Sequence, residues 1–290
     1  MKPPPFRYLA PRTTGEVFAL LAEHGPGAKV LAGGQSLVPV LNFRLARPDV
    51  IIDLAGVSGL DSIGFDNGSN EIVIGAMVRQ SDAERSVVVK ERLPLLTRAL
   101  GLIGHRTIRN RGTVGGSLAH ADPAAELPLV LVALGGRVKL ASGRGERWVG
   151  AGEFFVSYLT TALEADEILV EARFPILAPG DGWGLVEFSR RSGDFALAAA
   201  CATFGIVAGA LTGPRLTIAG GGPVPLRATA AEDRLAGRPA TAETFAAAAA
   251  LAAAASVTDS DIHASADYRR ELIATMARRA LGAAVANTVE

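Results

Sequence analysis

Two short glycine-rich loops constrain this chain more than any other feature of its sequence. The first loop, residues 33–36, follows the apolar run at residues 29–32, and the second loop covers residues 112–117. Each contains two adjacent glycines, followed by a pattern typical of a helix start, and the pairs lie about 80 residues apart. Because glycine lacks a Cβ, its amide can approach a ligand closely, and successive amides in such a turn bind anions. Each loop alone is equally consistent with a tight turn that needs glycine only for its shape.

Neither loop has the spacing of a common nucleotide-binding motif. No Gly-Lys-Ser/Thr follows the second loop, as a Walker loop requires, and the Rossmann pattern G-x-G-x-x-G is absent from both. Ser36, Thr113 and Ser117 add hydroxyl donors beside the glycines. A dinucleotide whose pyrophosphate is held between the two loops would explain both of them at once.

Composition excludes several other functions. Lys+Arg and Asp+Glu both number 29, so the chain lacks the basic excess of a general nucleic-acid-binding protein. Cys201 is the one cysteine, which rules out an internal disulfide or an iron–sulfur cluster held by this chain alone. Its apolar neighbours predict a buried core residue. No histidine pair has metal-ligand spacing with a carboxylate, and no Gly-x-Ser-x-Gly is present, so we predict neither a metal site nor a serine hydrolase.

The remaining patterns predict an α+β protein with two domains, residues 1–175 and 176–290. Helical and strand patterns alternate up to a strand at residues 167–174, and prolines and glycines at residues 175–183 mark the boundary. Strands and then three helices, at residues 228–236, 241–255 and 268–286, are expected beyond it. Neither a signal peptide nor an apolar stretch of about 20 residues is found, so we expect no membrane span and a cytoplasmic location.

The loops carry a family resemblance. Ala-Gly-Gly-Gln-Ser-Leu at residues 32–37 and Thr-Val-Gly-Gly at residues 113–116 resemble the flavin-binding subunit of molybdenum hydroxylases. This family includes the carbon monoxide dehydrogenase medium subunit and the FAD domain of xanthine dehydrogenase. The resemblance extends over the whole chain, including residues 166–169 and the turn at residues 220–223. It implies a two-part FAD-binding domain of the vanillyl-alcohol-oxidase (PCMH) type, followed by a small C-terminal α+β domain with an antiparallel sheet and helices.

The resemblance also implies a set of FAD contacts. The pyrophosphate and ribityl chain would be held by the two loop regions, which comprise Lys29, Val30, Leu31, Ala32, Gly33, Gly34, Gln35, Ser36 and Leu37 in the first, and Gly112, Thr113, Val114, Gly115, Gly116 and Ser117 in the second. Four residues would lie along the adenosine end or near it, namely Ile103, Ala119, Asp122 and Glu126. Leu163 would make an apolar contact with the flavin or the adenine.

Phe195 departs from the family pattern. It ends the segment at residues 190–195, where the carbon monoxide dehydrogenase type carries a tyrosine over the flavin ring. The stacking face is retained and the hydroxyl is lost. A second open question is the basic run of Arg106, Arg109 and Arg111, which we expect either to be a solvated face or to contact the pyrophosphate or a partner subunit.

The resemblance implies the FAD-carrying electron-transfer subunit of a heterotrimeric molybdenum hydroxylase. Substrate would be oxidised at molybdopterin on a large subunit, [2Fe–2S] clusters on a small subunit would deliver electrons to FAD here, and NAD or a quinone-like acceptor would reoxidise it. The complex is expected to be a dimer of heterotrimers, and its substrate stays open. Two alternatives remain, a free-standing FAD oxidoreductase acting on a small alcohol or sugar nucleotide, and a scaffold that has lost FAD.

Overall fold

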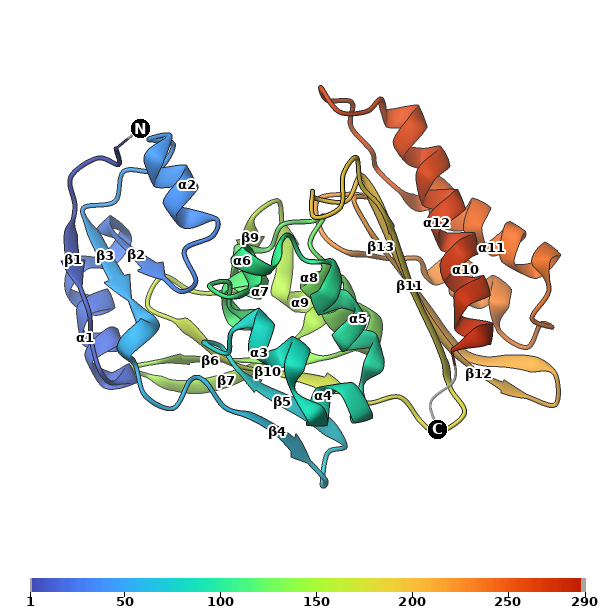
Figure 1. Cartoon of the computed structure of the whole chain (residues 1–290), viewed down its shortest axis with the longest axis horizontal. Helices are drawn as coiled ribbons and strands as arrows, with labels where there is room; N and C mark the ends of the chain where they lie inside the picture. Colours follow the sequence, from blue (N-terminus) through green and yellow to red (C-terminus); the bar gives the residue numbers. More distant parts are fainter. Residues whose placement is uncertain (1, 288–290) are drawn as a thin grey trace.

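The computed structural model describes residues 2–287, and its three larger sheets follow one another along the molecule in sequence order (Figure 1). A parallel sheet comes first, a five-stranded antiparallel sheet lies in the middle, and a four-stranded antiparallel sheet lies at the C-terminal end. The predicted α+β class, with an antiparallel sheet and helices in the C-terminal part, is confirmed.

The N-terminal sheet has the order β1-β3-β2, and all its strands are parallel. Its strands are β1 (Arg7–Leu9), β2 (Ala28–Leu31) and β3 (Val50–Asp53), and its helical segments are α1 (Thr14–His24), η1 (Gly25–Gly27), α2 (Leu37–Asn42) and η2 (Leu54–Gly56). Helix α1 begins at a capping box formed by Thr13 and Glu16. Its residues Val17 and Leu21 are buried in the same core as Ile52 of β3, which attaches the helix to the sheet.

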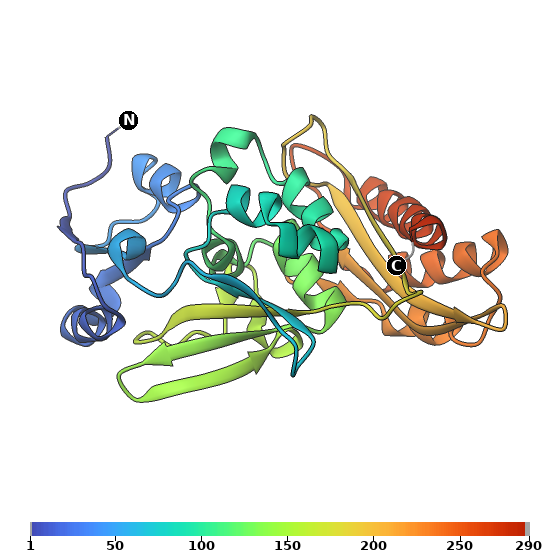
Figure 2. The same cartoon turned by 60° about the horizontal axis from the view of Figure 1, so that its bottom comes forward.

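The middle sheet has the order β4-β5-β10-β6-β7 and is antiparallel throughout. Its strands are β4 (Ile63–Asp66), β5 (Glu71–Gly75), β6 (Arg137–Ser142), β7 (Gly145–Gly150) and β10 (Ile168–Pro175), and a small hairpin is formed by β8 (Phe155–Ser157) and β9 (Thr160–Thr161). Helices cover one face of this sheet (Figure 2), and they are α3 (Gln80–Arg85), α4 (Val87–Arg92), α5 (Pro94–Leu102), α6 (Arg106–Arg109), α7 (Val114–His120), α8 (Glu126–Leu134) and α9 (Ala151–Phe154).

The C-terminal sheet has the order β11-β12-β13-β14. Its strands are β11 (Gly182–Phe188), β12 (Ala198–Val207), β13 (Ala210–Ala219) and β14 (Leu226–Arg227), and its helices are α10 (Thr229–Leu235), α11 (Ala242–Ala255) and α12 (Ala266–Ala286). Helix α12 crosses β11 (Figure 1) at two glycines, Gly182 and Gly184. A Cβ on Gly184 would lie 2.0 Å from the Ala280 carbonyl oxygen, so only glycine permits this close packing.

The C-terminal sheet is buried on both faces. Side chains of a strand alternate between faces, and β12 shows this directly. Ala200 and Ala202 face the core formed with α10, α11 and α12, whereas Ala199 and Cys201 belong to the core that contains α5 and α8 of the middle region. Cys201 is fully buried, as predicted. The division at residue 175 stays a prediction, because the two parts share this continuous core.

Candidate functional site

The first loop offers unpaired backbone amides. It leaves β2 and leads into α2, and Gly34 has φ +75°, a left-handed conformation that glycine adopts without strain. The Gln35 side-chain amide donates to the Gly33 carbonyl at 3.1 Å, which stabilises the turn. Among residues 2–287, the amides of Gly33, Gly34, Gln35 and Ser36 donate no hydrogen bond. Four successive free amides in a turn are the arrangement that binds an oxyanion.

The second loop uses its amides differently. Thr113 caps α7, and its hydroxyl oxygen accepts from the Gly116 amide at 3.0 Å. The Val114 and Gly115 amides donate to the carbonyls of Val78 (3.0 Å) and Ala76 (2.9 Å). Most amides of the second loop therefore already have partners, whereas the Thr113 amide has none among residues 2–287. The assignment of residues 112–117 to the pyrophosphate stays a prediction.

The two loops lie in direct contact. A Cβ on Gly33 would lie 2.5 Å from the Arg111 carbonyl oxygen and 3.0 Å from the Thr113 amide nitrogen. A Cβ on Gly116 would lie 3.2 Å from Cβ of Ala32. The sequence interpretation needs such proximity, because one pyrophosphate must reach both loops. The contact between the loops itself also requires glycine at position 33, because a side chain at Gly33 would separate the two loops whether or not a ligand is bound.

A part-buried arginine, Arg109, supports the neighbouring segment at Ile103. Arg109 donates through Nη1 to the Ile103 carbonyl at 2.8 Å, and its Nε lies 2.9 Å from Glu84 in an ion pair. Its side chain is 13% exposed, whereas Arg106 and Arg111 are exposed. The interpretation of the whole run as a solvated face is thus wrong for Arg109.

Phe195 lies in a loop of the C-terminal part that returns to this same segment. Gly193 has φ +87° and packs against the ring of His105, which a Cβ would approach to 2.8 Å. The Phe195 side chain is 63% exposed, so its ring is available to a ligand or a partner. Residues from both predicted domains therefore meet beside Ile103.

The other predicted contacts are spread around the loops. Lys29 is exposed, whereas Val30, Leu31, Leu37, Ala119 and Leu163 are half-buried. Asp122 caps the turn before α8, since its carboxylate accepts from the Ala124 amide at 2.9 Å. These positions as FAD contacts stay a prediction.

Two carboxyl groups with raised pKa values, those of Glu126 and Glu187, repel each other electrostatically. Glu126 begins α8 and is 7% exposed, and burial raises its pKa to about 8, assisted by repulsion from Glu187 and Asp122. Burial likewise raises the pKa of Glu187, on β11, to about 7, while the charge of Arg98 opposes this rise. Oε2 of Glu187 is buried without a hydrogen-bond partner in the described part of the chain. Near neutral pH Glu126 is therefore mostly the neutral acid, whereas Glu187 titrates in this range.

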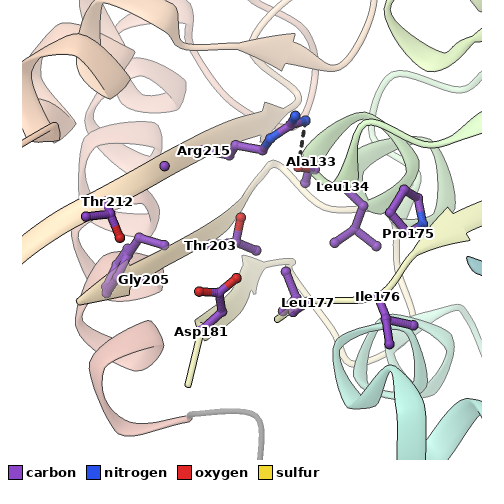
Figure 3. A pocket seen from close by; sticks show the side chains of 12 residues that line it. Ala133, Leu134, Pro175, Ile176, Leu177, Asp181, Thr203, Gly205, Thr212 and Arg215 are labelled. Atoms are coloured by element: carbon purple, nitrogen blue, oxygen red, sulfur yellow. Dashed lines mark hydrogen bonds between the residues drawn. The ribbon is translucent and has the colours of Figure 1, made fainter. Parts of the chain in front are cut away.

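One cavity lies away from the loops. It has a volume of about 260 Å³ and is lined by the end of α8, the segment after β10 and strands β12 and β13 (Figure 3). Arg215 points toward the last turn of α8, where Nη1 lies 3.5 Å from the Ala133 carbonyl oxygen, and Asp181 lies on the opposite side. None of the predicted contacts lines it.

Sequence reasoning missed several residues that shape the site. Arg79 pairs with Thr113 in a β-bridge and donates to the Arg111 carbonyl, so it fixes the second loop. Glu187 was also missed. No local pattern distinguishes either residue, because each acts through a contact distant in sequence.

Two absences apply to residues 2–287. No group of three or more histidine, cysteine, aspartate or glutamate side chains could hold a metal ion there. In the same part of the chain, no helix combines the length and hydropathy needed to cross a membrane.

Comparisons with known proteins match the whole chain. A family model described as the FAD binding domain in molybdopterin dehydrogenase matches residues 4–177, and the CO dehydrogenase flavoprotein C-terminal domain matches residues 185–284. The 6-hydroxypseudooxynicotine dehydrogenase complex subunit alpha of Paenarthrobacter nicotinovorans is 41% identical over 98% of this chain and 96% of its own length. The carbon monoxide dehydrogenase medium chain of Hydrogenophaga pseudoflava is 38% identical, with 98% of both chains covered.

Solved structures agree with the sequence comparisons. A chain of the Hydrogenophaga pseudoflava carbon monoxide dehydrogenase superposes with a TM-score of 0.96, at 38% identity over 99% of this chain and 100% of the other. A chain of quinoline 2-oxidoreductase from Pseudomonas putida 86 gives a TM-score of 0.93, at 38% identity over 99% of both. The fold expected from the two loops, an FAD-binding domain followed by an antiparallel C-terminal domain, is confirmed.

Proposed function

Because this chain belongs to the FAD-binding flavoprotein family of the molybdenum hydroxylases, we propose that it is the electron-transfer subunit of a heterotrimeric complex of that class. It takes electrons from [2Fe–2S] clusters on a small partner subunit and passes them to a terminal acceptor, either NAD or a quinone-like carrier. Substrate is oxidised on the large molybdopterin subunit. We further propose a dimer of heterotrimers in the cytoplasm.

The observation that carries this proposal is the turn with four free amides, held against the second loop. A diphosphate fits such a turn, because its oxygens accept hydrogen bonds and no side chain projects from Gly33 or Gly34. When bound, FAD supplies the redox chemistry, and the protein supplies binding, orientation and electrostatics. We assign the contacts predicted from the sequence, from Lys29 to Phe195, to this cofactor.

Each loop has a separate task in this arrangement. The amides of Gly33, Gly34, Gln35 and Ser36 bind the diphosphate directly. The second loop also provides the wall against which that turn is held, because its Val114 and Gly115 amides are bonded to the segment after β5. Phe195 presents an exposed aromatic ring two residues after Gly193, which packs against His105, and a planar ring system can stack on it.

Ser36 offers a sharp test with a matched control. It precedes α2 and its side chain makes no capping hydrogen bond, so aspartate and asparagine are both suitable replacements at this N-cap. Ser36→Asp places a negative charge at the turn and is expected to weaken FAD binding at least tenfold, whereas Ser36→Asn retains it. Reconstitution of the purified variants with FAD, followed by flavin absorbance and a binding titration, measures the difference. Equal affinity of the two variants contradicts the assignment.

A further inference from the structure

The segment that follows the first loop is far more apolar than its surroundings. Residues 37–45 read Leu-Val-Pro-Val-Leu-Asn-Phe-Arg-Leu, with seven apolar residues in nine. They form α2 and the turn after it, yet within them only Leu41 is buried. Val38 is 41% exposed, Phe43 64% and Leu45 79%. Isolated apolar side chains on a surface are common, but a run of neighbouring ones marks a contact site.

This surface begins at the cofactor loop. Val38 leans back over the turn, because a Cβ on Gly34 would lie 3.2 Å from its Cγ2. Phe43 and Leu45 lie beyond the other end of α2, which six residues make about 9 Å long. These two side chains therefore lie about one helix length away from the turn amides. Figure 1 shows α2 apart from the five-stranded sheet.

The charged residues around these side chains are all basic. Arg44 and Arg47 are the charged residues of positions 37–48, and both are exposed. Neither forms an ion pair with the residues that the structure describes. Arg44 contacts the carbonyl of Lys2, which brings a third basic residue to the same surface. The complementary partner has an apolar groove with carboxylates around it.

We propose that the α2 surface, formed by Val38, Phe43, Leu45, Arg44 and Arg47, docks the small [2Fe–2S] subunit. The inference rests on the proposed function, since that subunit must approach the flavin to deliver electrons. A protein seated on α2 lies next to the turn that holds the diphosphate. The apolar side chains supply affinity, and the arginines select an acidic groove and steer its approach.

The test uses the chain co-expressed with both partner subunits, with an affinity tag on this chain. The double variant Phe43→Ser/Leu45→Ser is expected to keep its FAD-to-protein ratio and melting temperature and to bind the iron–sulfur subunit at least tenfold more weakly. Val87→Ser/Val207→Ser is the matched control, because both valines are 64% exposed and lie on other elements. Arg47→Glu is expected to weaken binding and to reduce its dependence on salt.

Each alternative occupant gives a different result. Unchanged capture of the iron–sulfur subunit by the double serine variant overturns the proposal. Loss of FAD with the partner still bound assigns the surface to the cofactor instead. If the wild-type chain alone is a dimer and the double serine variant is a monomer, a second copy of this chain occupies the α2 surface, and this result also overturns the proposal. Failure of the wild-type chain to bind FAD would count against the proposed function and is measured separately, by absorbance.

Discussion

Replacing Glu126 by glutamine would change how the stability of the protein depends on pH. Glu126 is 7% exposed, and its pKa rises from 4.5 to about 8, mainly through burial. The folded protein therefore holds this proton at pH values where the unfolded chain has lost it. The stabilisation is fully present below about pH 4.5 and is lost as the pH rises through about 8.

The magnitude follows from the same numbers. One pKa unit corresponds to about 1.4 kcal/mol, so a rise from 4.5 to about 8 amounts to at most about 5 kcal/mol. Glu187 contributes in the same direction as the pH rises through about 7, and its partial exposure makes its share smaller. We expect the wild-type free energy of unfolding to fall by about 2–5 kcal/mol between pH 5 and pH 9.

Urea unfolding of the FAD-free protein at pH values from 5 to 9 measures this effect. Glu126→Gln keeps the shape of the side chain and cannot ionise, so its stability should fall less and exceed that of the wild type at pH 9. Glu271→Gln, on the exposed side of α12, is the control and should follow the wild type. Because Glu187 repels the Glu126 charge, its replacement should also lower the pKa of Glu126. Parallel curves for the wild type and Glu126→Gln would refute the reasoning.

Two further substitutions test the contacts around the loops. Gly33→Ala should destabilise the protein by about 1–3 kcal/mol, because its Cβ would meet the backbone of the second loop at 2.5 Å. Gly64→Ala meets nothing within 4 Å and should be near neutral, so equal urea midpoints for the two variants would contradict the loop contact. Arg109→Ala should cost about 2 kcal/mol, because it removes the partner of the half-buried Glu84. The exposed Arg106→Ala serves as its reference in thermal unfolding, and a similar loss in both would show that the ion pair contributes nothing.

The local parts of the fold could be predicted from the sequence. The capped helix at Thr13, the hairpin turn between β4 and β5, and the three C-terminal helices all follow from short-range patterns. Both glycine loops were found in the same way, because glycine pairs between an apolar run and a helix are visible along the chain.

What could not be predicted depends on contacts distant in sequence. The ion pair of Arg109 requires Glu84, which lies 25 residues earlier, and the raised pKa of Glu126 requires burial of α8, which packs against β12 and β13. The second loop resembles the first in composition, yet its Val114 and Gly115 amides are occupied by carbonyls of the segment that follows β5. Composition alone cannot show which amides already have partners.

Because of this difference, substitutions in the two loops should affect different properties of the protein. A change in the first loop that leaves its packing intact acts on ligand affinity, because the free amides there contribute little to the unliganded fold. A change in the second loop acts first on stability, since Thr113 and Gly115 join α7 to the segment after β5. A ligand that binds only the native state increases the free energy of unfolding by RT ln(1 + [L]/Kd). Saturating FAD should therefore rescue the folding of destabilised second-loop variants that still bind it, while variants of the first loop that no longer bind FAD gain nothing from the cofactor.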